Sequence, residues 1–484
     1  MTKRIRNRTA NNNKKLRRQH RKEVLSSKKN RKSTQKSVDE WLQSAANHMA
    51  TLDIEAAYHA YNNAHMELVQ QQQAPSSSIT TTQQEQMLHV LEKMGEIQVS
   101  LNDPDQARQH FLHALQLLEA QQKPSSWCML ESHANLCLYI GQLSIEQQAL
   151  EAYLKGVSSL EKCIQLVESN TDSVLPPTDS TMLMDGQATS EGQPSKKETL
   201  QQLKQKLSGA YCNVADLYLT DLCDEDTAES DCENYLEKAL QLKDNDGEPM
   251  VDALQTMANL RLSQHEDRRL DAVDFILRAY EKQRVGSEAL ASLVGLKDGG
   301  KRLRPSDDAA MQDHEDEEEA EQADELLEVE EANNLPEFEF RCQTAKILLE
   351  CADLLSKKRR SNENPSAVTI QETQCIDAAI SVLGSLLAQN DEVVEIWYLT
   401  GCAFAAKDPP LADTALFYLQ RAQTMLTDIR KGLSQELQFA EEIEREELEQ
   451  ELELNEEQMN DVMAKLTEMR SSAIGKEDAS MLED

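Results

Sequence analysis

The chain has 484 residues, of which 39% are hydrophobic and only 4% aromatic, and its formal net charge is −36. The sequence contains no run of 18 apolar residues and no apolar leader, so we expect neither a transmembrane helix nor a secretory signal peptide. Only 12 Pro and 15 Gly interrupt a sequence rich in good helix formers, and no alternating strand pattern is sustained. The sequence therefore predicts an all-α protein without membrane partners.

The charge is distributed unevenly. Residues 1–36 contain fifteen Lys or Arg and one acid, Glu23, so this segment carries +14 and the remainder carries −50. Paired bases of this kind are typical of nuclear import signals. The alternatives are weak contact with RNA phosphates, without an aromatic residue for base stacking before Trp41, and a plain solvated tail. We expect residues 1–37 to form a disordered basic tail that binds a nuclear import receptor and makes no direct nucleic-acid contact beyond a weak one. The candidate import residues are Lys14, Lys15, Arg17, Arg18, Lys28, Lys29, Arg31 and Lys32.

Small and large residues recur at a fixed spacing farther along the chain. A small residue is followed after 12 positions by a second small residue, after four more by a large residue, and after three more by a small one. This spacing is typical of tetratricopeptide repeats, in which small residues let two helices approach closely and the large residue fills the gap. The ungapped copies are Ala45, Ala57, Tyr61 and Ala64; Gly95, Ala107, Phe111 and Ala114; and Cys137, Ala149, Tyr153 and Gly156.

Looser copies continue the pattern and predict a tetratricopeptide-repeat superhelical solenoid of about seven helix pairs. They are Ala215 with Cys232, Leu236 and Ala239; Ala258 with Ala272, Ile276 and Ala279; Gly401 with Ala415, Leu419 and Ala422; and Ala378, Val382 and Ser385, whose first helix we expect over about 338–355.

Composition sets the expected domain boundaries. We expect the solenoid over 38–432, with one insertion over about 167–199, which is rich in Ser, Thr, Pro and Gly. A second insertion over about 294–335 begins basic and becomes strongly acidic, and such like-charge blocks stay disordered. Residues 433–484 are Glu-rich and are expected to form an acidic C-terminal helix or tail.

Repeat arrays bind partners on the concave face, which the first helix of each pair lines. Each acid there, taken alone, fits an ordinary surface charge, but together they indicate an acidic groove for a Lys/Arg-rich partner. The candidate groove acids are Glu92, Glu96, Glu131, Asp216, Asp252, Glu350 and Asp353.

No catalytic motif is present in the sequence. It contains no Gly-rich phosphate loop, no H-E-x-x-H and no G-x-S-x-G, and its ten Cys are scattered without zinc spacing. We therefore expect a binding protein without catalytic residues, metal or cofactor, and buried free thiols that suit a reducing compartment.

Several stretches within about 208–427 go beyond a generic repeat, namely Tyr218–Cys223, Ala253–Gln264, Phe338–Arg341, Thr344–Lys346 and Glu395–Leu399. Together they resemble the fungal assembly chaperones dedicated to the large-subunit ribosomal protein L-four. The resemblance implies a chaperone that holds the newly made protein by its basic internal loop, prevents its aggregation and escorts it into the nucleus for ribosome assembly. Phe338 and Tyr398, from these stretches, complete the candidate partner-binding residues.

Two alternatives remain. Many tetratricopeptide proteins are adaptors for the acidic C-termini of heat-shock chaperones, which they bind with Lys, Asn and Arg; the first repeat has Leu42 and Ala46 at the corresponding positions. The third interpretation is a scaffold subunit of a nuclear RNA-processing complex that uses the basic tail on RNA. The leading interpretation places the protein in the cytoplasm and the nucleus, shuttling between them.

Overall fold

The computed structural model describes the chain in seven stretches. They are residues 37–72, 81–120, 127–169, 195–294, 334–361, 366–439 and 442–480. The whole candidate import signal lies outside them, as do residues 170–194 and 295–333 of the two expected insertions.

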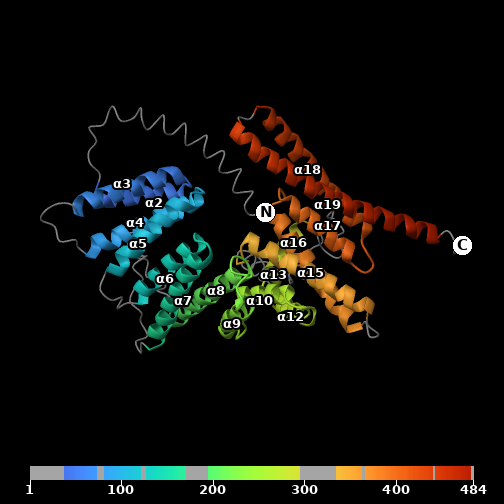
Figure 1. The fold of residues 1–484 in the computed structure, drawn as a ribbon, viewed down its shortest axis with the longest axis horizontal. Coiled ribbons are helices and arrows are strands. Elements are labelled where there is room, and N and C mark those ends of the chain that lie inside the picture. Colours follow the sequence, from blue (N-terminus) through green and yellow to red (C-terminus); the bar gives the residue numbers. More distant parts are fainter. Residues whose placement is uncertain are drawn as a thin grey trace, which may run out of the picture. The chain divides into compact units, whose positions relative to one another are not determined.

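The chain divides into two compact units, Met1–Met250 and Val251–Asp484. The helices of the first unit (Figure 1) are α2 (Val38–Ala50), α3 (Ile54–Gln72), α4 (Thr81–Ser100), α5 (Pro104–Ala120), α6 (Trp127–Gln142), α7 (Glu146–Ser169), α8 (Lys196–Leu219) and α9 (Ala228–Gln241). The helices of the second unit are α10 (Val251–Ser263), α11 (Glu266–Arg269), α12 (Ala272–Glu281), α13 (Arg284–Leu293), α15 (Phe338–Ser361), α16 (Ser366–Gln389), α17 (Val394–Ala406), α18 (Ala412–Phe439) and α19 (Glu442–Ser480).

The predicted all-α repeat fold is confirmed. The described residues form seven helix pairs, and the two helices of each pair pack against each other. The pairs are α2 with α3, α4 with α5, α6 with α7, α8 with α9, α10 with α12, α15 with α16, and α17 with α18. The same residues form no strand beyond one isolated bridge between Lys243 and Pro249. None of the described helices combines the length and apolar character that crossing a bilayer needs.

Capping residues mark the first turns of α2 and α8. Ser37 precedes α2, where its hydroxyl accepts a hydrogen bond from the backbone N–H of Glu40 at 3.3 Å and the Glu40 carboxylate accepts one from the backbone N–H of Ser37 at 2.9 Å. Ser195 and Glu198 form the same reciprocal arrangement at the start of α8. Each capping box satisfies backbone donors that would otherwise lack partners, which fixes where the helix begins.

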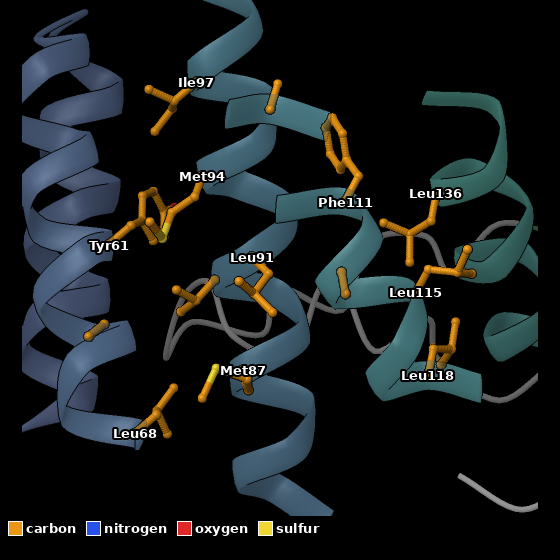
Figure 2. Close-up of a cluster of buried hydrophobic side chains, with 14 of the residues drawn as sticks. Tyr61, Leu68, Met87, Leu91, Met94, Ile97, Phe111, Leu115, Leu118 and Leu136 are labelled. Atoms are coloured by element: carbon orange, nitrogen blue, oxygen red, sulfur yellow. The ribbon is translucent and has the colours of Figure 1, made fainter. Parts of the chain in front are cut away.

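The repeat residues form the core of the pairs. In the first unit, buried side chains from α2 to α7 make one apolar cluster, in which Phe111 projects from α5 toward α4 (Figure 2). An added Cβ on Gly95 would lie 2.5 Å from Cε1 of Phe111, so the glycine makes room for the ring. Gly401 does the same in the last pair, where an added Cβ would lie 2.6 Å from Cγ of Leu419.

The third pair differs from its template. Cys137 stands at the position of Gly95 and is buried, but the ring of Tyr153 lies over Gly141, one turn farther along α6. An added Cβ on Gly141 would lie 2.6 Å from the Tyr153 ring. Cys137 already carries a Cβ, so the aromatic ring takes the nearby position that has none.

The helices differ from the expected organisation in three respects. Residues 167–169 and 196–199, expected in a loop, are the end of α7 and the start of α8. α13 is an additional helix that packs against α16. α18 continues past residue 432, so the expected limit of the solenoid falls inside a helix, and α19 packs along α18.

A buried arginine joins α15 to α16. Arg341 is only 2% exposed, and it donates hydrogen bonds to the Pro336 carbonyl at 3.0 Å and to Oγ of Ser385 at 2.7 Å. Gln389 accepts a third hydrogen bond from the same guanidinium. These bonds compensate the buried guanidinium for lost water and fix the start of α15 on α16.

Candidate functional site

The register of the pairs defines one comparable side of the first helices. Glu92 and Glu96 lie three residues before and one residue after Gly95; Tyr398 and Cys402 have the same relation to Gly401. At about 100° per residue, the two positions lie on the same side of the helix, about 60° and about 100° round from the glycine that touches the second helix. We call this side of the first helices the inner face, since first helices line the concave surface of repeat arrays.

Glu92 and Glu96 lie together on the inner face of α4. Lys93 pairs with Glu96 at 2.7 Å, whereas Glu92 has no ion pair among the described residues. Burial, and secondarily the negative charge of Glu96, raises the pKa of Glu92 to about 7. Tyr139 of α6 lies close enough that these charges contribute, after burial, to its raised pKa. We call Glu92, Lys93, Glu96 and Tyr139 the Glu92 cluster.

The chemistry of the Glu92 cluster favours a cationic ligand. The half-buried Glu92 carboxylate has lost water, and the charge of Lys93 offsets that loss only in part, so its charged form is disfavoured. An ammonium or guanidinium group supplied from outside would restore that stability through a charge-assisted hydrogen bond. The cluster can therefore distinguish a basic side chain from a neutral one.

Two other predicted acids of the first unit lie on α6 and α8. Glu131 forms an ion pair with Lys206 of α8, so part of its charge is already neutralised. Asp216 is exposed, and burial together with the charge of Asp216 raises the pKa of Tyr153 in α7 to about 12. Glu92 differs from Glu131 in forming no ion pair within the described residues, and from Asp216 in being half-buried.

In the second unit the predicted acids are mostly paired. Glu350 forms an ion pair with Arg269 at 2.8 Å, and Asp353 pairs with Lys357 at 2.7 Å. Asp252 near the start of α10 and Phe338 at the start of α15 are half-buried. Asp252 lies on α10, whereas Phe338, Glu350 and Asp353 lie on α15, where about three helical turns separate Phe338 from Glu350.

Tyr398, the predicted partner contact on α17, is half-buried. Burial, its hydrogen bond with Cys402, and the charges of Asp461 and Glu468 raise its pKa. Asp461 and Glu468 belong to α19, so the C-terminal helix lies over this part of α17.

The cations of the site were missed in the sequence. Lys93 could have been found from its spacing of three residues before Glu96, which favours a pair on a helix surface. Lys206, which lies 75 residues beyond Glu131, carries no local signal. Lys346 and Glu395, which pair at 2.8 Å between α15 and α17, were likewise invisible in the sequence.

One arrangement resembles a catalytic triad. Oγ of Ser159 lies 2.9 Å from Nδ1 of His133, and Nε2 of His133 lies 3.6 Å from Oε1 of Glu119. Ser159 is only 6% exposed and lies in the middle of α7, where backbone N–H groups are engaged in helix hydrogen bonds. Substrate therefore has neither access to the hydroxyl nor an oxyanion site beside it, so the contact is structural.

In the part of the chain that the structure describes, no three His, Cys, Asp or Glu side chains gather in a way that could hold a metal ion. All ten cysteines lie in this part as free thiols, and seven of them are buried.

Comparison with known proteins supplies the remaining information. No protein-family model matches the chain. Over 193 residues it is 28% identical to the "Probable assembly chaperone of rpl4" of Schizosaccharomyces pombe, a match that covers 40% of this chain and 45% of the relative. This chain is similar to an assembly chaperone of Rpl4. The resemblance indicated by the sequence is thereby confirmed, over less than half of the relative's length.

Two solved structures are also similar. The "Assembly Chaperone of RpL4 (Acl4) (Residues 1-338)" has 21% sequence identity and a TM-score of 0.43, covering 76% of this chain and 95% of that one. A "Circular tandem repeat protein with novel repeat topology and enhanced subunit contact surfaces" has 12% identity and a TM-score of 0.22, covering 91% of this chain and 97% of that one.

Proposed function

We propose that this chain is a dedicated, non-enzymatic assembly chaperone of Rpl4. It binds the newly made basic protein through the acidic inner face, prevents its aggregation and escorts it to the nucleus. The similarity to the fission yeast chaperone supports the choice of client. The half-buried carboxylate of Glu92, with no cation paired to it in the described part of the chain, is the observation that supports the binding mode.

Binding of a basic segment would be driven mainly by charge. The remainder of the chain beyond residue 36 carries −50, so a Lys/Arg-rich client is attracted over a long range. Close contacts at the Glu92 cluster would then add specificity. Since salt screens such attraction, the complex weakens as ionic strength rises.

The decisive experiment is copurification of the chain with Rpl4 and titration of the complex. We expect a one-to-one complex whose dissociation constant rises with salt. Glu92→Gln together with Glu96→Gln should weaken it about tenfold or more, equivalent to about 1.4 kcal/mol or more. Glu151→Gln on the exposed surface of α7 is the matched control and should leave affinity unchanged. Failure of the natural chain to bind Rpl4 at low salt would contradict the proposed function.

The escort role rests on the basic tail. We propose that residues 1–36 bind an import receptor, because they hold fifteen Lys or Arg against one acid. Deleting them should abolish nuclear accumulation of a fluorescent fusion and leave Rpl4 binding in vitro intact. Nuclear entry at the natural level by the deleted chain would refute this part of the proposal.

A further inference from the structure

The C-terminal helix α19 is docked on the last pair by a short apolar stripe. Val462, Leu466 and Met469, spaced four and three residues apart, are buried, as are Leu426 and Leu433 of α18. Figure 1 shows α18 and α19 running side by side, and α19 also contacts α17. Apolar residues at this spacing form one stripe along the helix, which packs against the neighbouring helix.

The same helix lies over the inner face of α17. Tyr398 and Cys402 occupy the positions that Glu92 and Glu96 occupy on α4. Lys465 and Glu468 of α19 are close enough to Cys402 to affect its pKa, which burial raises. α19 therefore takes, at the last pair, the place that a client segment would take at the second pair.

We propose that α19 is an intramolecular strap that competes with the basic client segment for the inner face of the last pair. This inference rests on the proposed function, since it requires a client on the inner face. Binding of the client at the last pair releases α19 from α17, and α19 closes over that face again when the client leaves.

A buried polar residue weakens the contact between α18 and α19. Asn455 is 3% exposed at the α18–α19 contact, where its Nδ2 donates to the Leu426 carbonyl at 3.1 Å. Its Oδ1 is buried and has no hydrogen-bond partner among the described residues. A buried amide that is only half satisfied sets the register of two helices and weakens their association relative to an apolar residue. Release of α19 is correspondingly easier.

Charge also favours release in the presence of a basic client. Glu453, Glu457 and Asp461 lie four residues apart on the exposed side of α19, and such like charges repel each other. Asp461 is exposed, yet it is close enough to the half-buried Tyr398 that its charge helps to raise the pKa of the phenol. Once α19 is released, these exposed acids are available to pair with a Lys/Arg-rich client segment, which favours the released state.

Hydrogen–deuterium exchange of the full chain, alone and with recombinant Rpl4 as the probe, tests the release directly. We expect amides within residues 455–469 to exchange about tenfold faster in the complex, because local opening controls exchange. The amides of α4 should be slowed in the same sample. Unchanged or slower exchange of α19 in a formed complex would overturn the strap.

Two substitutions change the docking of α19 in opposite directions. Asn455→Leu replaces the half-satisfied amide by an apolar side chain, and should slow exchange of α19 and weaken Rpl4 binding about three- to tenfold. Leu466→Ala loosens the helix and should strengthen binding by a similar factor. Gln450→Ala, exposed on the same helix, is the matched control. Equal affinities, or the reverse order, would overturn the inference.

The same experiments separate this inference from the proposed function. Thiol labelling of Cys402 in the client-free chain should accelerate in Leu466→Ala while circular dichroism stays unchanged, which shows that α19 is loosened without unfolding. A complex that forms without release of α19 refutes the strap alone. If neither the natural chain nor Leu466→Ala binds Rpl4, the proposed function fails and the strap falls with it.

Discussion

The ring of Phe111 lies against Gly95 so closely that a Cβ at that position would be 2.5 Å from the ring. This contact joins α4 to α5 in the middle of the first unit's core. It also fixes the register that presents Glu92 and Glu96 on the inner face.

Gly95→Ala should therefore destabilise the first unit. The aromatic ring is fully buried and cannot move aside without disturbing the core, so we expect a loss of about 1–3 kcal/mol in the free energy of unfolding. Gly432→Ala is the control, because an added Cβ there meets no atom within 4 Å and alanine favours the helix. Urea denaturation measures both; equal stability of the two variants would contradict the close contact.

Leu52→Asn should stabilise the turn between α2 and α3. Leu52 has a φ of 56° and is 82% exposed, whereas the corresponding residue between α4 and α5 is Asn102, with a φ of 58°. Asparagine tolerates the left-handed region better than leucine, so we expect a gain of about 0.5–1 kcal/mol. The reciprocal change, Asn102→Leu, should cost a similar amount. Thermal unfolding measures the stability of both variants. A shift of both in the same direction would contradict this prediction.

Glu92→Gln should stabilise the chain at alkaline pH even though it weakens client binding. The folded-state pKa of Glu92 is raised to about 7 from its ordinary value of 4.5. The folded state therefore holds its proton more tightly, and the associated stability is present below pH 4.5 and is lost as pH rises through 7. At pH 8 the substitution removes a cost of at most about 3 kcal/mol. Glu85→Gln, exposed on the same helix, should have no comparable effect. A difference between Glu92→Gln and the natural chain that does not grow with pH would contradict the assignment.

Arg359→Leu should destabilise the second unit. Arg359 pairs with Glu372 at 2.9 Å and with Asp408 at 2.8 Å, and Glu372 is 5% exposed. Removing the cation leaves a buried carboxylate without its counter-ion, which costs about 3–5 kcal/mol.

A double substitution, Arg359→Leu with Glu372→Leu, should recover much of that stability, since no buried charge remains unpaired. Lys357→Ala is the surface control: its pair with Asp353 has side chains 67% and 61% exposed, and its loss should change stability by less than about 1 kcal/mol. Chemical denaturation of the four chains measures the coupling. A double variant as unstable as Arg359→Leu would argue against the buried pair.

The repeat could be predicted because its signal is local. Gly95, Ala107 and Phe111 lie within 17 consecutive residues, and each spacing follows from helix geometry and the length of one turn. The local pattern was misleading at Cys137, because the ring of Tyr153 lies against Gly141, one turn farther along the helix. The template finds the helices, but which small residue receives the ring depends on the packing.

The candidate site could be predicted only in part. Glu92 and Glu96 share a helix face, so their four-residue spacing already places them together. The ion pair between Glu131 and Lys206 joins α6 to α8, and no local sequence pattern indicates it.

The amino-acid sequence by itself determined the helical pairs, their order and the negative charge of the chain beyond residue 36, because these follow from local periodicity and composition. Only the tertiary structure decided which charges meet and what covers them. Phe111 reaches Gly95 through one turn of chain, whereas α19 reaches Tyr398 about 60 residues later, after a second helix has reversed its direction. Helical spacing determines the face on which a side chain lies, while the folding of distant segments determines what packs against that face.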